Sequence, residues 1–169
     1  MTGSVDIEII ERQLDRVQSF IPRIDGRLTG YLAILSGQMA LAFTNIDKSD
    51  IDGWFLLTCL VVFLGCAVWA FINIYQCSHP NIEGPKKSLI FFFEIEKMGL
   101  KDYQDAFLSA SEDYLKQDLL NQIHRNSQIV AQKYRHLRAA SAAMLFGSAP
   151  WAILLLGASL KNYRLPLLP

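Results

Sequence analysis

One stretch in the second half of this 169-residue chain limits its possible folds more than any other. Residues 111–139 contain no proline and no glycine, and apolar side chains recur there at steps of three and four residues. This is the period of an amphipathic helix and not the two-residue period of a strand. The pattern runs without a break signal into residues 140–160, which are apolar enough to cross a bilayer. The sequence therefore predicts a polar helix joined directly to a membrane span.

Apolar residues concentrate in three blocks, which is typical of a membrane protein. The first two predict a transmembrane hairpin over 28–77, with spans at about 28–46 and 53–75, and the third predicts a span at 139–160. About 100 residues remain outside, enough for a small helical domain but too few for a typical catalytic α/β domain. The predicted fold class is an all-α membrane protein, with three transmembrane helices and a small cytosolic helical bundle or coiled coil.

Small residues line one side of the first predicted span, at Gly26, Gly30, Ala33, Gly37 and Ala40. Small faces let membrane helices approach closely. Two interpretations stay open, which are packing against the second span and a dimer face, and the first is favoured.

Residues 1–27 are predicted to form a cytosolic amphipathic helix, because a narrow apolar seam runs along 5–21. Such a seam needs a partner helix, and residues 103–138 are the expected partner. The helical stripe of that partner is expected to run through Tyr103, Phe107, Ala110 and Tyr114 into the long helix. Residues 88–96 are ambiguous between a strand, a buried helical turn and an apolar plug at the membrane surface.

Charged residues beside the spans predict the topology through the positive-inside rule. The rule places the N-terminus and the predicted sensor region, 78–138, in the cytoplasm, and the 45–52 loop and the short tail at 161–169 outside. The basic residues that carry this assignment are Arg23, Arg27, Lys86, Lys87, Lys133, Arg135 and Arg138.

Composition and motifs give little support to catalysis. Sixteen basic and sixteen acidic residues balance, so charge gives no argument for nucleic-acid binding. No P-loop, nucleophile elbow or HExxH motif occurs, and Cys77 with His79 supplies too few ligands for zinc. We therefore expect no enzyme activity, no metal and no cofactor.

A line of polar residues follows the long helix, formed by Asp118, Gln122, Asn126 and Lys133. The amides of Gln and Asn offer a donor and an acceptor together, which suits a nucleobase edge, and Lys133, Arg125 or Arg135 suits a phosphate. The alternative interpretation is an ordinary solvated helix face, and periodicity alone favours that alternative.

Several segments together resemble a known family. They are IFFFEI, DYQDAF, the run DLLNQIHRNSQIVAQKYRHLRAA before a span, and FIPRIDGR before the first span. In the last segment Asp25 precedes a basic residue, Arg27, by two positions, where the family more commonly has lysine. Over roughly residues 15–160 the chain resembles the Pycsar membrane effector family.

This resemblance implies a bacterial anti-phage system in which a partner pyrimidine cyclase makes cyclic CMP or cyclic UMP. The implied effector is a homo-oligomer in the lipid bilayer of the inner (plasma) membrane. It responds to that ligand by impairing membrane integrity and causing abortive infection. The resemblance supplies no residue assignments, so the ligand contacts are predicted from residue type. A base would face Asp118, Gln122 and Asn126, a phosphate would face Arg125 or Lys133, and rings would stack on Tyr103, Phe93 or Tyr134.

Two other functions stay open. One is a non-enzymatic oligomeric membrane scaffold that binds no small molecule, and the other is an effector that answers a cyclic oligonucleotide. The predicted spans carry essentially no ionisable groups. This favours bulk membrane disruption, or a pore formed on assembly, over a selective ion channel.

Overall fold

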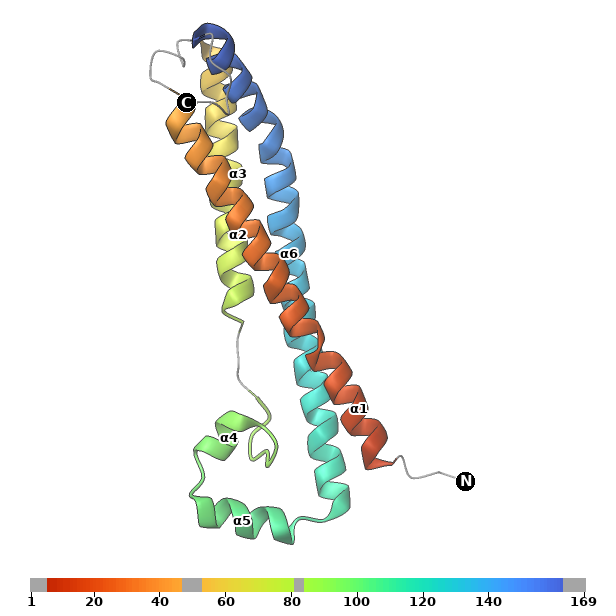
Figure 1. Ribbon diagram of the computed structural model, residues 1–169. Helices are drawn as coiled ribbons and strands as arrows, with labels where there is room; N and C mark the ends of the chain where they lie inside the picture. The colour runs from red at the N-terminus through yellow and green to blue at the C-terminus, as the bar shows by residue number, and fades with distance from the viewer. Residues whose placement is uncertain (1–5, 47–52, 81–83, 163–169) are drawn as a thin grey trace. The chain divides into compact units, whose positions relative to one another are not determined.

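A computed structural model describes residues 6–46, 53–80 and 84–162, and within them all regular secondary structure is helical (Figure 1). The all-α class is therefore confirmed. The helices are α1 (Ile7–Gln18), α2 (Phe20–Asn45), α3 (Trp54–Ser78), α4 (Phe92–Glu96), α5 (Leu100–Ser109) and α6 (Glu112–Asn162). The loop predicted to face outward lies mostly outside the described residues, as does most of the C-terminal tail.

The chain divides into two compact units. The first unit comprises Met1–Ile24 and Pro80–Gln132, and the second comprises Asp25–His79 and Lys133–Pro169. Helices α2 and α6 each contribute residues to both units. The long helix predicted from the 111–139 pattern is confirmed, since α6 is one helix of 51 residues that includes Pro150.

Among the described residues, two helices, α3 and α6, are long and apolar enough to cross a membrane. The first predicted span, at about residues 28–46, lies in α2, which carries polar residues such as Gln38 and Asn45, and its role as a span stays a prediction. Helix α2 begins at Phe20, earlier than the predicted span. Pro22 does not interrupt it, because a proline in the first helical turn removes an N–H that has no partner within the helix.

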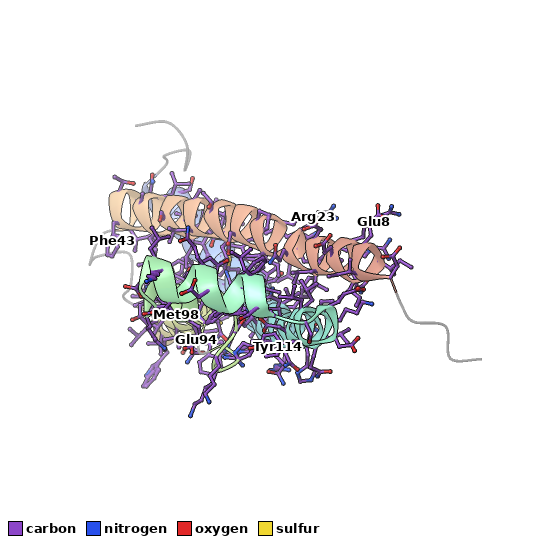
Figure 2. All side chains as sticks on the ribbon, turned by 90° about the horizontal axis from the view of Figure 1, so that it is seen from below. Glu8, Arg23, Phe43, Glu94, Met98 and Tyr114 are labelled. Carbon is purple, nitrogen blue, oxygen red and sulfur yellow. The ribbon has the colours of Figure 1, made fainter. Side chains whose placement is uncertain are left out.

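In the first unit, α1 packs against α6 as the sequence predicted. Ile10 and Leu14 of α1 form one core with Leu119 of α6. Asp6 caps α1, since its carboxylate accepts a hydrogen bond from the Glu8 amide. Glu8 is exposed and pairs with Arg12 on the outer side of the helix (Figure 2).

The second unit has its own core. Ala42 of α2, Cys59 and Phe63 of α3, and Leu154 of α6 pack together. At Gly147 of α6 an added Cβ would lie only 2.9 Å from the Cβ of Cys66, so α3 and α6 approach closely where a glycine permits it.

The small-residue side of α2 is not packed tightly. A Cβ added at Gly26, Gly30 or Gly37 would meet no atom within 4 Å among the described residues. The favoured interpretation, close packing of this side against the second span, is therefore wrong. The glycines leave an open strip along α2.

The structure also decides two open points around the short helices. Of the alternatives for residues 88–96, the helical turn is the one that forms, as α4 after the buried residue Phe91, although no residue of α4 itself is buried. The stripe expected to run unbroken through Ala110 is interrupted, because Ala110 has extended backbone angles and ends α5. Helix α6 then starts with a local cap, in which the Ser111 hydroxyl accepts a hydrogen bond from the Tyr114 amide.

Candidate functional site

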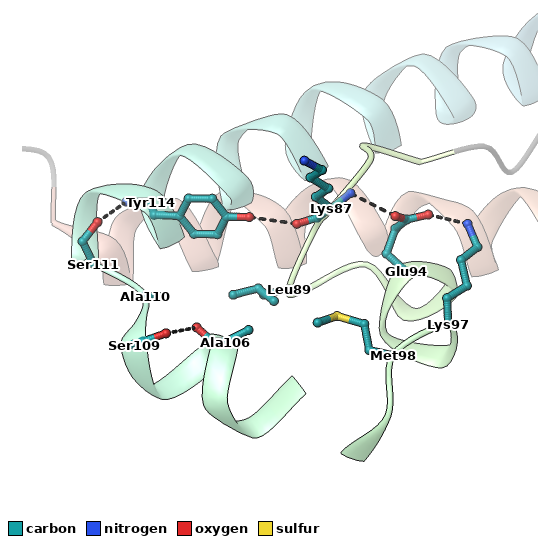
Figure 3. A pocket seen from close by; sticks show the side chains of 10 residues that line it. All are labelled: Lys87, Leu89, Glu94, Lys97, Met98, Ala106, Ser109, Ala110, Ser111 and Tyr114. Carbon is teal, nitrogen blue, oxygen red and sulfur yellow. Dashed lines mark hydrogen bonds and ion pairs between the residues drawn. The ribbon is translucent and has the colours of Figure 1, made fainter. Parts of the chain in front are cut away.

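The first unit contains an open cavity of about 670 Å³. It lies between α4, α5, the start of α6 and the segment before α4 (Figure 3). Its lining residues are Lys87, Leu89, Glu94, Lys97, Met98, Ala106, Ser109, Ala110, Ser111 and Tyr114. A cavity of this size is within the range of roughly 300–1,000 Å³ that small-molecule sites occupy.

A chain of polar contacts forms one edge of the cavity (Figure 3). The Tyr114 hydroxyl donates to the Lys87 carbonyl at 2.8 Å. The Lys87 N–H donates to Glu94 Oε2 at 2.9 Å, and Lys97 Nζ donates to Glu94 Oε1 at 2.5 Å. Both backbone polar groups of Lys87 are thus held by side chains from two different helices.

Lys87 has an unusual backbone conformation, with φ of 61°. A residue with a Cβ is strained in this left-handed region, and such strain persists only where the surroundings enforce it. The contacts with Tyr114 and Glu94 supply that enforcement. Strained residues of this kind cluster at ligand sites, so Lys87 marks this edge as a candidate binding element.

The ionisation of Glu94 is set by the same contacts. The hydrogen bond from Lys97, and next the one from the Lys87 backbone, lower the pKa of the Glu94 carboxyl from its ordinary value. Glu94 is therefore a carboxylate at neutral pH, and it is the only acidic side chain in the described lining.

The floor of the cavity is apolar. Leu89, Met98 and Ala106 point toward its centre from three segments (Figure 3). Leu89 is held by Asp118, which accepts hydrogen bonds at Oδ2 from the Leu89 amide at 2.8 Å and from the Ser88 hydroxyl at 3.0 Å. Figure 2 labels Glu94, Met98 and Tyr114, three of the residues that line the cavity.

Three of the predicted ligand residues lie on or beside the helices that form the cavity, but none of the three lines it. Asp118 does not line the cavity, and it acts on it only by fixing Leu89. Phe93 of α4 and Tyr103 of α5 do not line the cavity, and their rings lie against Phe92 and Phe107 respectively. The aromatic side chain that does line it is Tyr114, which the sequence pattern had assigned to the apolar stripe.

The remaining predicted residues of the first unit lie further along α6. Gln122 is only 4% exposed, and its Nε2 has no hydrogen-bond partner among the described residues. Arg125 donates to Gln128, and Asn126 is half-buried. Their role as ligand contacts stays a prediction.

Lys133 and Tyr134 belong to the second unit, where both meet the segment around Asp25. Lys133 Nζ donates to Asp25 Oδ1 at 2.5 Å, with the lysine side chain 7% exposed and the aspartate 48% exposed. Arg27 donates to the Tyr134 hydroxyl at 3.5 Å. A smaller cavity of about 250 Å³ adjoins the ion pair. The Asp25 and Arg27 pattern thus contacts two of the predicted ligand residues.

Burial decides between the interpretations of the polar line on α6. Taken as whole residues, Asp118, Gln122 and Lys133 are all at most 6% exposed. An ordinary solvated face is therefore wrong for these three residues. Buried polar groups need partners, and Asp118 and Lys133 have theirs within the chain.

In the part of the chain that the structure describes, no three His, Cys, Asp or Glu residues gather in one place, and the absence of a metal stays an expectation.

The comparisons with known proteins add the family. The family model of the Pycsar effector protein domain (PycTM) matches residues 9–158. No curated protein matches the chain, and no solved structure matches it. Because the match covers most of the 169 residues, the chain belongs to the Pycsar effector family.

Proposed function

We propose that this Pycsar effector protects a bacterial population against phage by impairing the inner membrane when a cyclic pyrimidine nucleotide, cyclic CMP or cyclic UMP, binds to it. The ligand comes from a partner cyclase, and the effector itself catalyses no reaction. Helices α2, α3 and α6 cross the membrane, with the N-terminus and residues 78–138 in the cytoplasm. Membership of the family and the two apolar helices support this proposal.

The observation that carries the ligand part of the proposal is the cavity of the first unit. A cyclic mononucleotide has an apolar base face and an anionic phosphate, and the cavity offers an apolar floor beside an edge with two lysines. The base packs on Leu89, Met98 and the ring of Tyr114, since a π-face suits both apolar and aromatic partners. Of the predicted ligand residues, Asp118 positions the floor and does not touch the base.

Activation requires two states that the ligand binds with different affinity. Binding in the cavity favours one packing of α4 and α5 against the start of α6. Because α6 is one uninterrupted helix, that packing biases how its apolar segment associates with other copies. The open glycine strip of α2 supports a homo-oligomer, since small residues allow close helix contacts between chains.

The experiment measures depolarisation of cells that express the full-length protein with a cyclase making cyclic CMP, cyclic UMP or cyclic AMP. Ala106→Trp fills the cavity, and Leu108→Trp places the same side chain at an 84% exposed position on the same helix. We expect depolarisation with one cyclic pyrimidine, its loss in Ala106→Trp and its retention in Leu108→Trp.

Three results would contradict this proposal. An equal response of both variants would place the ligand outside the cavity. A response only to a cyclic oligonucleotide supplied by its own synthase would change the ligand class. No response to any nucleotide, with the protein verified in the membrane, would favour an oligomeric scaffold.

A further inference from the structure

We propose that the Glu94 carboxylate occupies an anion subsite of the cavity, and that the phosphate of the ligand takes its place. The subsite consists of the Lys87 N–H and the Lys97 ammonium group. The inference rests on the proposed function for the identity of the ligand, but the subsite itself is defined by its two donors. Glu94 is thus an internal competitor that sets how strongly an anion must bind.

The geometry of the carboxylate supports the exchange. Each oxygen of Glu94 accepts one hydrogen bond, from Lys87 N at 2.9 Å and from Lys97 Nζ at 2.5 Å. A phosphodiester also presents two charged oxygens on one central atom, so it can accept from the same pair of donors. The Lys97 side chain is 66% exposed, which leaves it free to follow an incoming phosphate.

Charge favours the same exchange. The cavity lining holds two lysines and one carboxylate, and Lys86 lies close enough to stabilise a negative charge at this point. When a phosphate replaces Glu94, the displaced carboxylate is hydrated and both lysines face the ligand. A neutral nucleoside cannot make this replacement, so the subsite selects for the phosphate of the ligand.

The backbone of Lys87 explains why an anion is needed. Its left-handed conformation is held from one side by Tyr114 and from the other by Glu94. If Glu94 leaves without a replacement, the Lys87 N–H loses its acceptor and the strained conformation loses one of its two supports. A phosphate restores the acceptor while it frees α4, which carries Glu94, from its tether to Lys87. Ligand binding therefore changes which group holds the helix α4.

The test uses the full-length protein in detergent micelles, with inorganic phosphate, cyclic CMP and cyclic UMP as calorimetric probes. Glu94→Gln removes the competing charge, and Glu96→Gln is the matched control on the same helix, at an exposed position. We expect Glu94→Gln to bind inorganic phosphate about tenfold more tightly than wild type, which corresponds to one charge-assisted hydrogen bond. We expect Glu96→Gln to bind as wild type does.

Lys97→Met provides a second variant, because it removes a donor and leaves the carboxylate in place. Weaker phosphate binding by Lys97→Met supports the subsite even if Glu94→Gln does not fold. Phosphate affinity that neither Glu94→Gln nor Lys97→Met changes would overturn the subsite, and so would equal gains in Glu94→Gln and Glu96→Gln.

The two proposals fail in different ways. If phosphate responds to Glu94→Gln but no cyclic nucleotide binds, the subsite stands and the proposed function falls. If a cyclic pyrimidine binds, Ala106→Trp abolishes this binding and Glu94→Gln leaves the phosphate affinity unchanged, the proposed function stands and the subsite falls.

Discussion

Asp118 should hold Leu89 in the apolar floor of the cavity, and replacing Asp118 should loosen the floor at that residue. Its side chain is 5% exposed, and Oδ2 accepts hydrogen bonds from Leu89 N at 2.8 Å and Ser88 Oγ at 3.0 Å. The Ser88 hydroxyl in turn accepts hydrogen bonds from the amides of Ile90 and Phe91. Asp118→Ala removes the acceptor on which this network closes.

The magnitude follows from the burial and the two bonds. A hydrogen bond to a charged group contributes about 1.5–3 kcal/mol, so two bonds set an upper bound of about 6 kcal/mol. Releasing a buried carboxylate from its desolvation penalty offsets several kcal/mol of this loss. We expect a net local destabilisation of about 2 kcal/mol for Asp118→Ala, and about half of that for Asp118→Asn, which keeps an oxygen acceptor.

Hydrogen exchange of the Leu89 amide in the full-length protein measures this local opening directly. A loss of about 2 kcal/mol speeds exchange roughly thirtyfold. Asp113→Asn is the matched control, because Asp113 lies on the same helix and is exposed. Leu89 exchange within threefold of wild type in Asp118→Ala, or equal acceleration in Asp113→Asn, would refute the reasoning.

Three further predictions concern contacts elsewhere in the chain. Asp25→Asn should lower the free energy of unfolding by about 2 kcal/mol, and Lys133→Met should lower it by less, because only Asp25→Asn leaves a buried ammonium group without its ion-pair partner. Thermal unfolding in micelles measures both losses, and a larger loss in Lys133→Met would contradict this prediction. Gln38→Leu should lower the free energy of unfolding by about 0.6 kcal/mol, because it removes the hydrogen bond from Gln38 Nε2 to the Ser148 hydroxyl. The double variant with Ser148→Ala should lose no further stability in the same thermal unfolding experiment. Fully additive losses would rule this hydrogen bond out as the cause. Because the pKa of Glu94 is lowered, its contacts stabilise the fold fully above the ordinary carboxyl pKa, and this stabilisation is lost as the pH falls through the lowered pKa. The NMR resonance of the Lys87 amide should therefore shift over that pH range in wild type, and it should not shift there in Glu94→Gln.

Periodicity predicted the parts of the fold that depend on long regular patterns. The steps of three and four residues predicted α6 and its contact with α1, and Ile10 and Leu14 of α1 form one core with Leu119 of α6. The same patterns missed the break between α5 and α6. There the outcome depends on Ser111, whose hydroxyl caps α6, and on one extended residue, Ala110, and neither changes the apolar period.

The cavity could not be read from the sequence for a related reason. Its lining mixes small, polar and apolar side chains from four segments, with no common spacing. Tyr114 lies on the predicted apolar stripe, so periodicity assigns its ring to packing although its hydroxyl holds Lys87. The left-handed backbone of Lys87 depends on Glu94 and Tyr114 together, and such a condition appears only once the chain has folded.

Gln122 offers the sharpest test of the polar line that the sequence singled out. The buried side chains of Asp118 and Lys133 form hydrogen bonds with Leu89 and Asp25 respectively, whereas Gln122 Nε2 has no partner among the described residues. An unpaired buried donor destabilises a fold, so Gln122→Leu should raise the free energy of unfolding by about 1 kcal/mol.

Because Gln122 does not line the cavity, Gln122→Leu should also bind the cyclic nucleotide as tightly as wild type does. Thermal unfolding and calorimetry on the same preparation measure both effects. If Gln122→Leu is more stable than wild type but no longer binds the nucleotide, the nucleotide contacts the polar line of α6 and not the cavity. In that case Gln122 is kept at a cost in stability because its side chain hydrogen-bonds to the ligand.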